Sequence, residues 1–126
     1  MTLEELKNFL KHKRGEHLEF YECQTGLDYR LFDTVGAFLN TKGGLIVLGV
    51  KQDGSISGID PSNIQKFKKE IIKSSNNPSF INPPFILRPE EFLIDNKYVI
   101  AIWVPISSQV HKYSNVIFDR VNDMDI

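Results

Sequence analysis

Carboxylates recur around the first predicted strand and in one later turn, at Glu16, Glu19, Glu22 and Asp53. Carboxylates bind hard cations such as Mg²⁺ and Mn²⁺, which assist phosphodiester cleavage by stabilising charge and activating water. An aspartate also suits the Gln-Asp-Gly-Ser turn itself, because its side chain bonds nearby backbone N–H groups. The set fits either a metal-dependent nuclease or a solvated, hydrogen-bonded strand end, and the second interpretation is the simpler one.

Two predicted helices carry rows of cations. The first row is Lys7, Lys11, Lys13 and Arg14, and the second is Lys66, Lys68, Lys69 and Lys73. Phosphate binding needs mobile cations on one surface, although a lysine-rich helix face is commonly only solvated. Neither row is interleaved with the aromatic residues that stack on single-stranded bases. Both interpretations therefore stay open for each row.

The glycine-rich stretch AFLNTKGGLIVLGVKQDGSISGID, residues 37–60, raises the question of a phosphate-binding loop. A Walker loop needs G-x-x-x-x-G-K-[ST] between a strand and a helix. Here Gly49 and Gly54 have that spacing, but Ser55 follows, and the context is strand-turn-strand. The favoured interpretation is structural: Gly43 and Gly44 end a helix in a left-handed conformation and begin a central strand.

Hydrophobic periodicity predicts the elements that position these residues. Helices are expected at residues 2–15, 31–39 and 61–73, the first opened by a capping box and the third with Ile64, Phe67, Ile71 and Ile72 inward. Strands are expected at residues 17–23, 44–50, 55–59, 91–104 (a hairpin), 110–113 and 116–121. The pattern predicts an α/β (α+β) fold, a mixed sheet of about five or six strands with two or three helices.

Composition limits the classes of protein. A chain of 126 residues with 41% hydrophobic residues suits a single domain. The formal net charge of −1 argues against a strongly cationic nucleic-acid binder. Cys23 is the only cysteine, so one chain holds neither a disulfide framework nor a cysteine-rich zinc site. No apolar run approaches the length of a membrane span, and the expected location is the cytoplasm.

The strings GEHLEFYE, AFLNTKGGLIVLGVKQDGSISGID and VIAIWVPISSQVHKYSNVIFDRVND resemble the Alba-like DNA-binding domain, found in Schlafen proteins and at the amino terminus of bacterial regulators. The resemblance covers residues 15–123 and implies an Alba-like fold over residues 1–126. It also implies one module of a longer protein. Some relatives are labelled divergent AAA-type ATPases, but the phosphate loop that ATP binding needs is missing here.

The resemblance also bears on individual residues. Schlafen relatives hold a metal with two glutamates and a later aspartate. Glu19 matches the glutamate of the Glu-Phe step, Glu16 is close but out of register, and Asp53 lies in a turn that needs an aspartate anyway. The position five residues before Glu19, an acid in those relatives, is Arg14, and the usual lysine after Glu-Phe is Tyr21. These departures from the family pattern argue against the hypothesis that the chain is a nuclease.

In the family, a histidine-containing segment and a late arginine lie near the Asn-Thr-Gly-Gly turn, which implies a third set around His111, Lys112 and Arg120. Arg120 fits bidentate phosphate binding and structural pairing with Asp119 or Asp53 equally well. Asn40 and Thr41 suit closure of a helix by local hydrogen bonds. The three histidines show no zinc spacing.

The leading hypothesis is a non-catalytic nucleic-acid-binding module of a bacterial transcriptional regulator, with DNA preferred over RNA. The expected contacts are Lys11, Lys13, Arg14, His111 and Arg120. A module of this kind is expected to bind neither a cofactor nor a membrane. One alternative is a Schlafen-like endoribonuclease that uses Glu16, Glu19 and Asp53 with Mg²⁺ or Mn²⁺. Another is an assembly module, a homo-oligomer formed through exposed strand edges after Pro105.

Overall fold

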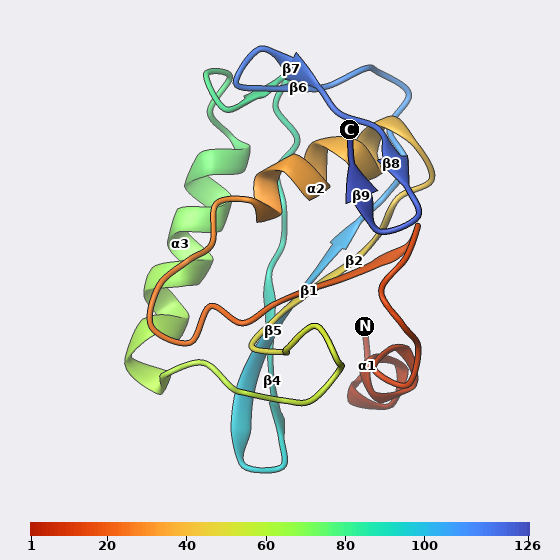
Figure 1. Cartoon of the computed structure of the whole chain (residues 1–126). Coiled ribbons are helices and arrows are strands. Elements are labelled where there is room, and N and C mark those ends of the chain that lie inside the picture. The colour runs from red at the N-terminus through yellow and green to blue at the C-terminus, as the bar shows by residue number, and fades with distance from the viewer.

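The computed structural model describes every residue, 1–126. Three α-helices and nine strands follow one another along the chain (Figure 1). The helices are α1 Leu3–Phe9, α2 Leu31–Asn40 and α3 Ile64–Ser75, and the 3-10 turn Pro61–Asn63 leads into α3. The strands are β1 Leu18–Tyr21, β2 Gly44–Leu48, β3 Ile81–Asn82, β4 Glu90–Ile94, β5 Lys97–Val104, β6 Lys112–Tyr113, β7 Val116–Ile117, β8 Arg120–Val121 and β9 Met124–Asp125.

The main sheet has four strands in the order β1-β2-β5-β4. β1 and β2 run parallel, with α2 as the connection between them, whereas β5 is antiparallel to both of its neighbours. Two small sheets lie outside it, β3-β6-β7 and the hairpin β8-β9. The predicted α/β class and mixed sheet are confirmed, and several of the predicted strands belong to these smaller sheets.

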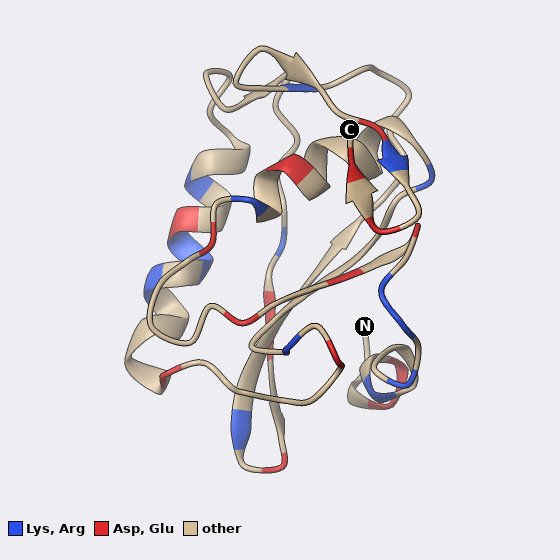
Figure 2. Cartoon of the chain, viewed as in Figure 1, with Lys and Arg blue, Asp and Glu red and all other residues tan.

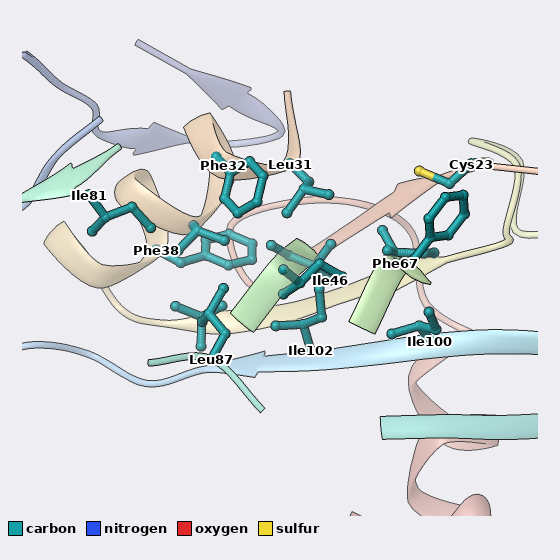
Figure 3. Packing of buried hydrophobic residues seen from close by; sticks show 14 of the residues in the cluster. Cys23, Leu31, Phe32, Phe38, Ile46, Phe67, Ile81, Leu87, Ile100 and Ile102 are labelled. Carbon is teal, nitrogen blue, oxygen red and sulfur yellow. The ribbon is translucent and has the colours of Figure 1, made fainter. Parts of the chain in front are cut away.

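Helices cover both faces of the main sheet. Alternate residues of β2 and β5, such as Ile46 and Ile102, pack against α2 and α3 (Figure 3). The intervening residues, such as Leu45 and Val99, pack on the other face with Leu6 of α1. Each such side chain stabilises the fold by about 1.5–3 kcal/mol when fully buried. As a result, α1 and α3 lie on opposite faces of the sheet.

The Gly-Gly pair has the structural role that the sequence predicted. Gly43 has a φ of +73°, and its N–H donates to Phe38 O at 2.8 Å, which ends α2. A Cβ atom at Gly44 would lie 2.7 Å from His17 O, because β1 passes close by. The glycines therefore let the chain turn directly from helix into buried strand.

Three local predictions were wrong. α1 ends at Phe9 rather than near Gly15. Tight turns follow the helix, in which Lys11 N donates to Asn8 O and His12 N donates to Phe9 O, because the chain must reverse toward β1. Residues 55–59 form only isolated bridges at Ile56 and Ile59 rather than a strand. Ile72 is 42% exposed, because the inward stripe of α3 passes through its neighbour Ile71. None of the three helices is long and apolar enough to cross a lipid bilayer.

Candidate nucleic-acid interface

A polar cleft of about 500 Å³ lies beside the end of α1. It is lined by the segment from Leu10 to Arg14, which follows the helix, and by Phe20, Gln52, Asp53 and Asp123. The segment follows the helix immediately, so its cations adjoin the carbonyl end of the helix dipole. The cleft is thus the place where the first basic row meets a concave surface.

Lys11 and Lys13 are the free cations of this cleft. Both side chains are exposed and neither forms an ion pair. Figure 2 shows the basic segment between α1 and β1 at the right of the molecule. Free, mobile ammonium groups can follow a phosphate backbone without losing an existing partner. These two residues have the properties that phosphate contact requires.

Arg14 lies deeper and has two partners. Its Nη1 donates to Glu19 Oε1 at 3.1 Å, and its Nη2 donates to Asp123 Oδ2 at 3.1 Å. The side chain is 23% exposed, so the guanidinium still borders the cleft. Arg14 therefore holds Glu19 and can offer only its remaining N–H groups to a ligand.

Arg120 is buried and its guanidinium is used within the chain. Its side chain is 1% exposed, and it donates to Glu19 Oε2 at 3.2 Å and to Asp125 Oδ1 at 2.9 Å. It also donates to the carbonyl oxygens of Gly15 and Leu18 and lies over the Phe38 ring. Of the two roles left open for Arg120, this geometry supports the structural one, but the paired carboxylates are Glu19 and Asp125 rather than the predicted Asp119 or Asp53.

His111 is also buried, at 2% exposure, and both ring nitrogens have partners. Nε2 lies 2.7 Å from Ser107 Oγ, and Nδ1 lies 2.6 Å from Pro83 O. Asn40 fixes the same segment, because its Oδ1 accepts from His111 N at 2.7 Å and its Nδ2 donates to the carbonyls of His111 and Phe118. His111 is therefore held away from solvent, in a structural position.

The three acids of the nuclease hypothesis lie in separate settings. Glu19 is 4% exposed and pairs with two arginines, as described above. Glu16 pairs with Lys42, and Asp53 caps its own turn through Ser55 N and Oγ, which lowers the pKa of Asp53. No group of three or more His, Cys, Asp or Glu side chains is arranged to hold a metal ion. The residues present do not fit a Mg²⁺ or Mn²⁺ site.

A hydrogen-bonded chain extends the network from Arg120 to α2. Thr34 Oγ1 donates to Asp125 Oδ2 at 2.6 Å and lies 2.7 Å from the Tyr21 hydroxyl. Burial raises the pKa of Tyr21, and burial together with Asp125 raises the pKa of Asp33 nearby. Tyr21, which replaces the family's lysine, thus bonds to Thr34 of α2, and Thr34 in turn bonds to Asp125 of the C-terminal hairpin. Sequence reasoning missed this network, since its members are far apart in the chain.

The family model described as "Schlafen, AlbA_2" matches residues 5–126. The chain belongs to this family. The match confirms the Schlafen-type resemblance and spans both the Asn-Thr-Lys-Gly-Gly turn, residues 40–44, and the C-terminal hairpin. A comparison with curated proteins finds no match.

Two solved structures resemble the AlbA_2 domain described here. The DIP2311 protein of Corynebacterium diphtheriae has a TM-score of 0.67 and 18% identity, over 98% of this chain and 26% of that chain. The N-terminal domain of a RecG-related protein from Nitrosomonas europaea, named as a candidate ATP-dependent DNA helicase, has a TM-score of 0.56 and 17% identity. That second match covers 82% of this chain and 71% of the other. The chain spans about a quarter of the DIP2311 protein, and at these identities the likeness shows the fold alone.

Proposed function

We propose that this AlbA_2 domain is a non-catalytic nucleic-acid-binding module that contacts DNA phosphates through Lys11, Lys13 and Arg14. The observation that carries the proposal is the cleft beside α1, where two exposed, unpaired lysines and a partly exposed arginine share one concave surface. Membership of the Schlafen AlbA_2 family supports it. The name of the Nitrosomonas protein, a DNA helicase candidate, supports DNA as the ligand.

The charge balance of the cleft predicts weak binding. Asp53 and Asp123 face the same space as the cations and oppose a polyanion. Contacts to phosphate position a protein on DNA but carry no base sequence. We infer that the module supplies general, salt-sensitive affinity, and that sequence choice comes from other parts of a longer protein, a bacterial transcriptional regulator of the cytoplasm.

The catalytic alternative has less support. A nuclease of the proposed type needs carboxylates free to bind a metal, whereas Glu19 is occupied by Arg14 and Arg120. Arg14 itself stands at the position where Schlafen relatives carry an acid. We therefore assign the Glu19 region a role in stability and in positioning Arg14.

The test of the proposed function is a titration of labelled duplex DNA with the purified chain at low and at high salt. We expect binding at low salt that weakens steeply as salt rises, since each phosphate contact releases counterions. Absence of binding at the lowest salt would rule out DNA binding by this chain.

A further inference from the structure

A second basic surface lies on α3, on the opposite face of the main sheet from α1. Lys66, Lys69 and Lys73 are spaced three and four residues apart and share one side of the helix. All three are exposed and form no ion pair, whereas Lys68 pairs with Glu91 at 3.5 Å. Figure 2 shows these basic bands along α3 at the left of the molecule.

The three lysines line a hollow of about 480 Å³. Glu70 lies among them, so the three positive charges and one negative charge leave a formal charge of +2. The hollow includes Ser74 in the last turn of the helix and continues past the helix end to Asn77 and Phe80. Lys66 and Lys73 are separated by about 10 Å along the helix axis. That distance covers neighbouring phosphates of one nucleic-acid strand.

An aromatic ring closes this hollow. Phe80 is half-buried, and its ring stacks on Tyr113 with a centroid distance of 6.2 Å and an interplanar angle of 18°. Its backbone N–H donates to Asn77 O at 2.9 Å, which fixes the turn that carries it. Sequence inspection found no aromatic residue within the lysine row, because Phe80 reaches the row only through the turn after α3.

We propose that this hollow binds single-stranded nucleic acid, with the lysines on successive phosphates and Phe80 stacked against one base. A row of mobile cations beside a fixed aromatic ring is the combination that single-strand sites use. A duplex does not offer the open base face that the ring needs. The site is separate from the α1 cleft and goes beyond the proposed function, which concerns phosphate contacts of DNA at α1.

The experiment measures fluorescence anisotropy of a labelled oligothymidine strand and of an abasic strand of the same length. The variant Lys66→Ala/Lys69→Ala/Lys73→Ala is expected to bind the thymidine strand at least about tenfold more weakly at low salt. Its salt slope should fall by about two units, since single strands lose roughly 0.7 units per phosphate contact. Lys68→Ala, on the same helix but outside the hollow, is the matched control and should bind like the wild type.

A second variant tests the stacking. Phe80→Leu keeps apolar contact with Tyr113 and should bind the thymidine strand about tenfold more weakly, with no change for the abasic strand. If Phe80→Leu does not fold, the wild-type preference for thymidine over abasic DNA gives the same information. Equal wild-type affinity for the two strands would overturn the proposal and leave a general anion surface, one that an acidic peptide would also fit.

The two surfaces can fail independently. Lys11→Ala/Lys13→Ala should weaken duplex binding and leave the preference for the thymidine strand over the abasic strand unchanged. If the α3 triple variant binds the thymidine strand like the wild type, the α3 site is wrong, whatever the α1 variant does. If the α1 variant leaves duplex binding unchanged, the proposed phosphate contacts of Lys11 and Lys13 are refuted. The α3 site is then still tested by the α3 triple variant with the thymidine and abasic strands.

Discussion

Arg120 Nη2 lies 3.2 Å from Glu19 Oε2, and both side chains are almost fully buried. The two residues are 101 positions apart in the chain. Their ion pair joins the C-terminal hairpin β8-β9 to the edge strand β1, and Asp125 completes it on the hairpin side. The residues that suggested a metal site and a phosphate contact thus neutralise one another in the interior.

Removing one member of this pair should be costly. Arg120→Ala is expected to lower the free energy of unfolding by about 3 kcal/mol, because Asp125 loses its ion-pair partner and buried Glu19 keeps only Arg14. Arg30→Ala breaks the exposed pair with Asp28 and should cost less than about 1 kcal/mol. Urea unfolding of both variants makes the comparison, and equal losses would contradict the buried network.

Asn40 should matter for stability as much as a core residue. Its side chain makes three hydrogen bonds to the backbone of His111 and Phe118. Asn40→Ala is expected to cost about 3 kcal/mol, since each lost bond contributes about 1 kcal/mol. Asn76→Ala, at the exposed end of α3, is the control and should stay within about 0.5 kcal/mol of wild type. Thermal or urea unfolding that ranks them the other way would refute this role.

The free energy of unfolding should depend on pH in the alkaline range. Burial raises the pKa of the Cys23 thiol to about 11, above the ordinary value of 9.0, and burial also raises the pKa of Tyr21. The unfolded chain therefore loses its thiol proton first. The stability from the neutral thiol is complete below pH 9 and is lost as pH rises toward 11.

For Cys23 alone this loss is about 2 kcal/mol near pH 11. The measurement is urea unfolding at neutral and at alkaline pH, with Cys23→Ala as the comparison. The variant should show a shallower alkaline decline than the wild type. Identical declines for the two proteins would show that Cys23 contributes nothing to the pH dependence.

Divalent metal should have no specific effect on this chain. Because Glu19 is paired with arginine, we expect millimolar Mn²⁺ or Mg²⁺ to leave the melting temperature unchanged. Structured RNA should be cut no faster by the wild type than by Glu19→Gln. Cleavage that needs both Mn²⁺ and Glu19 would restore the nuclease, whatever the melting data show.

The sequence predicted the parts of the fold that depend on local pattern. The stripe of α2 and the doubly buried β2 follow from residue spacing, and the turn at Gly43 follows from its glycine. The partner that a polar side chain binds cannot be predicted from local pattern in the same way. Arg120 could equally have met phosphate or carboxylate, and only the folded chain brings Glu19 to it across 101 positions.

The sequence also did not predict where α1 ends or how the residues of the two candidate sites are arranged. α1 stops at Phe9 because the chain must turn back toward β1, a requirement of tertiary structure rather than of the residues themselves. Thr41 bonds locally to Ala37 O, as expected, whereas Asn40 bonds to a segment 71 positions away. Phe80 joins the lysines of α3 through a turn that no periodicity describes.

The most direct test of the central claim is a salt titration of duplex DNA binding by Lys11→Ala/Lys13→Ala. The control is Lys68→Ala/Lys112→Ala, which removes the same charge outside the cleft. We predict that the cleft variant binds more weakly and that its salt slope falls by about two units, close to 0.9 units per lost phosphate contact. The control should keep the wild-type slope. Equal slopes for the cleft variant and the wild type would contradict the assignment of the α1 cleft as the nucleic-acid interface.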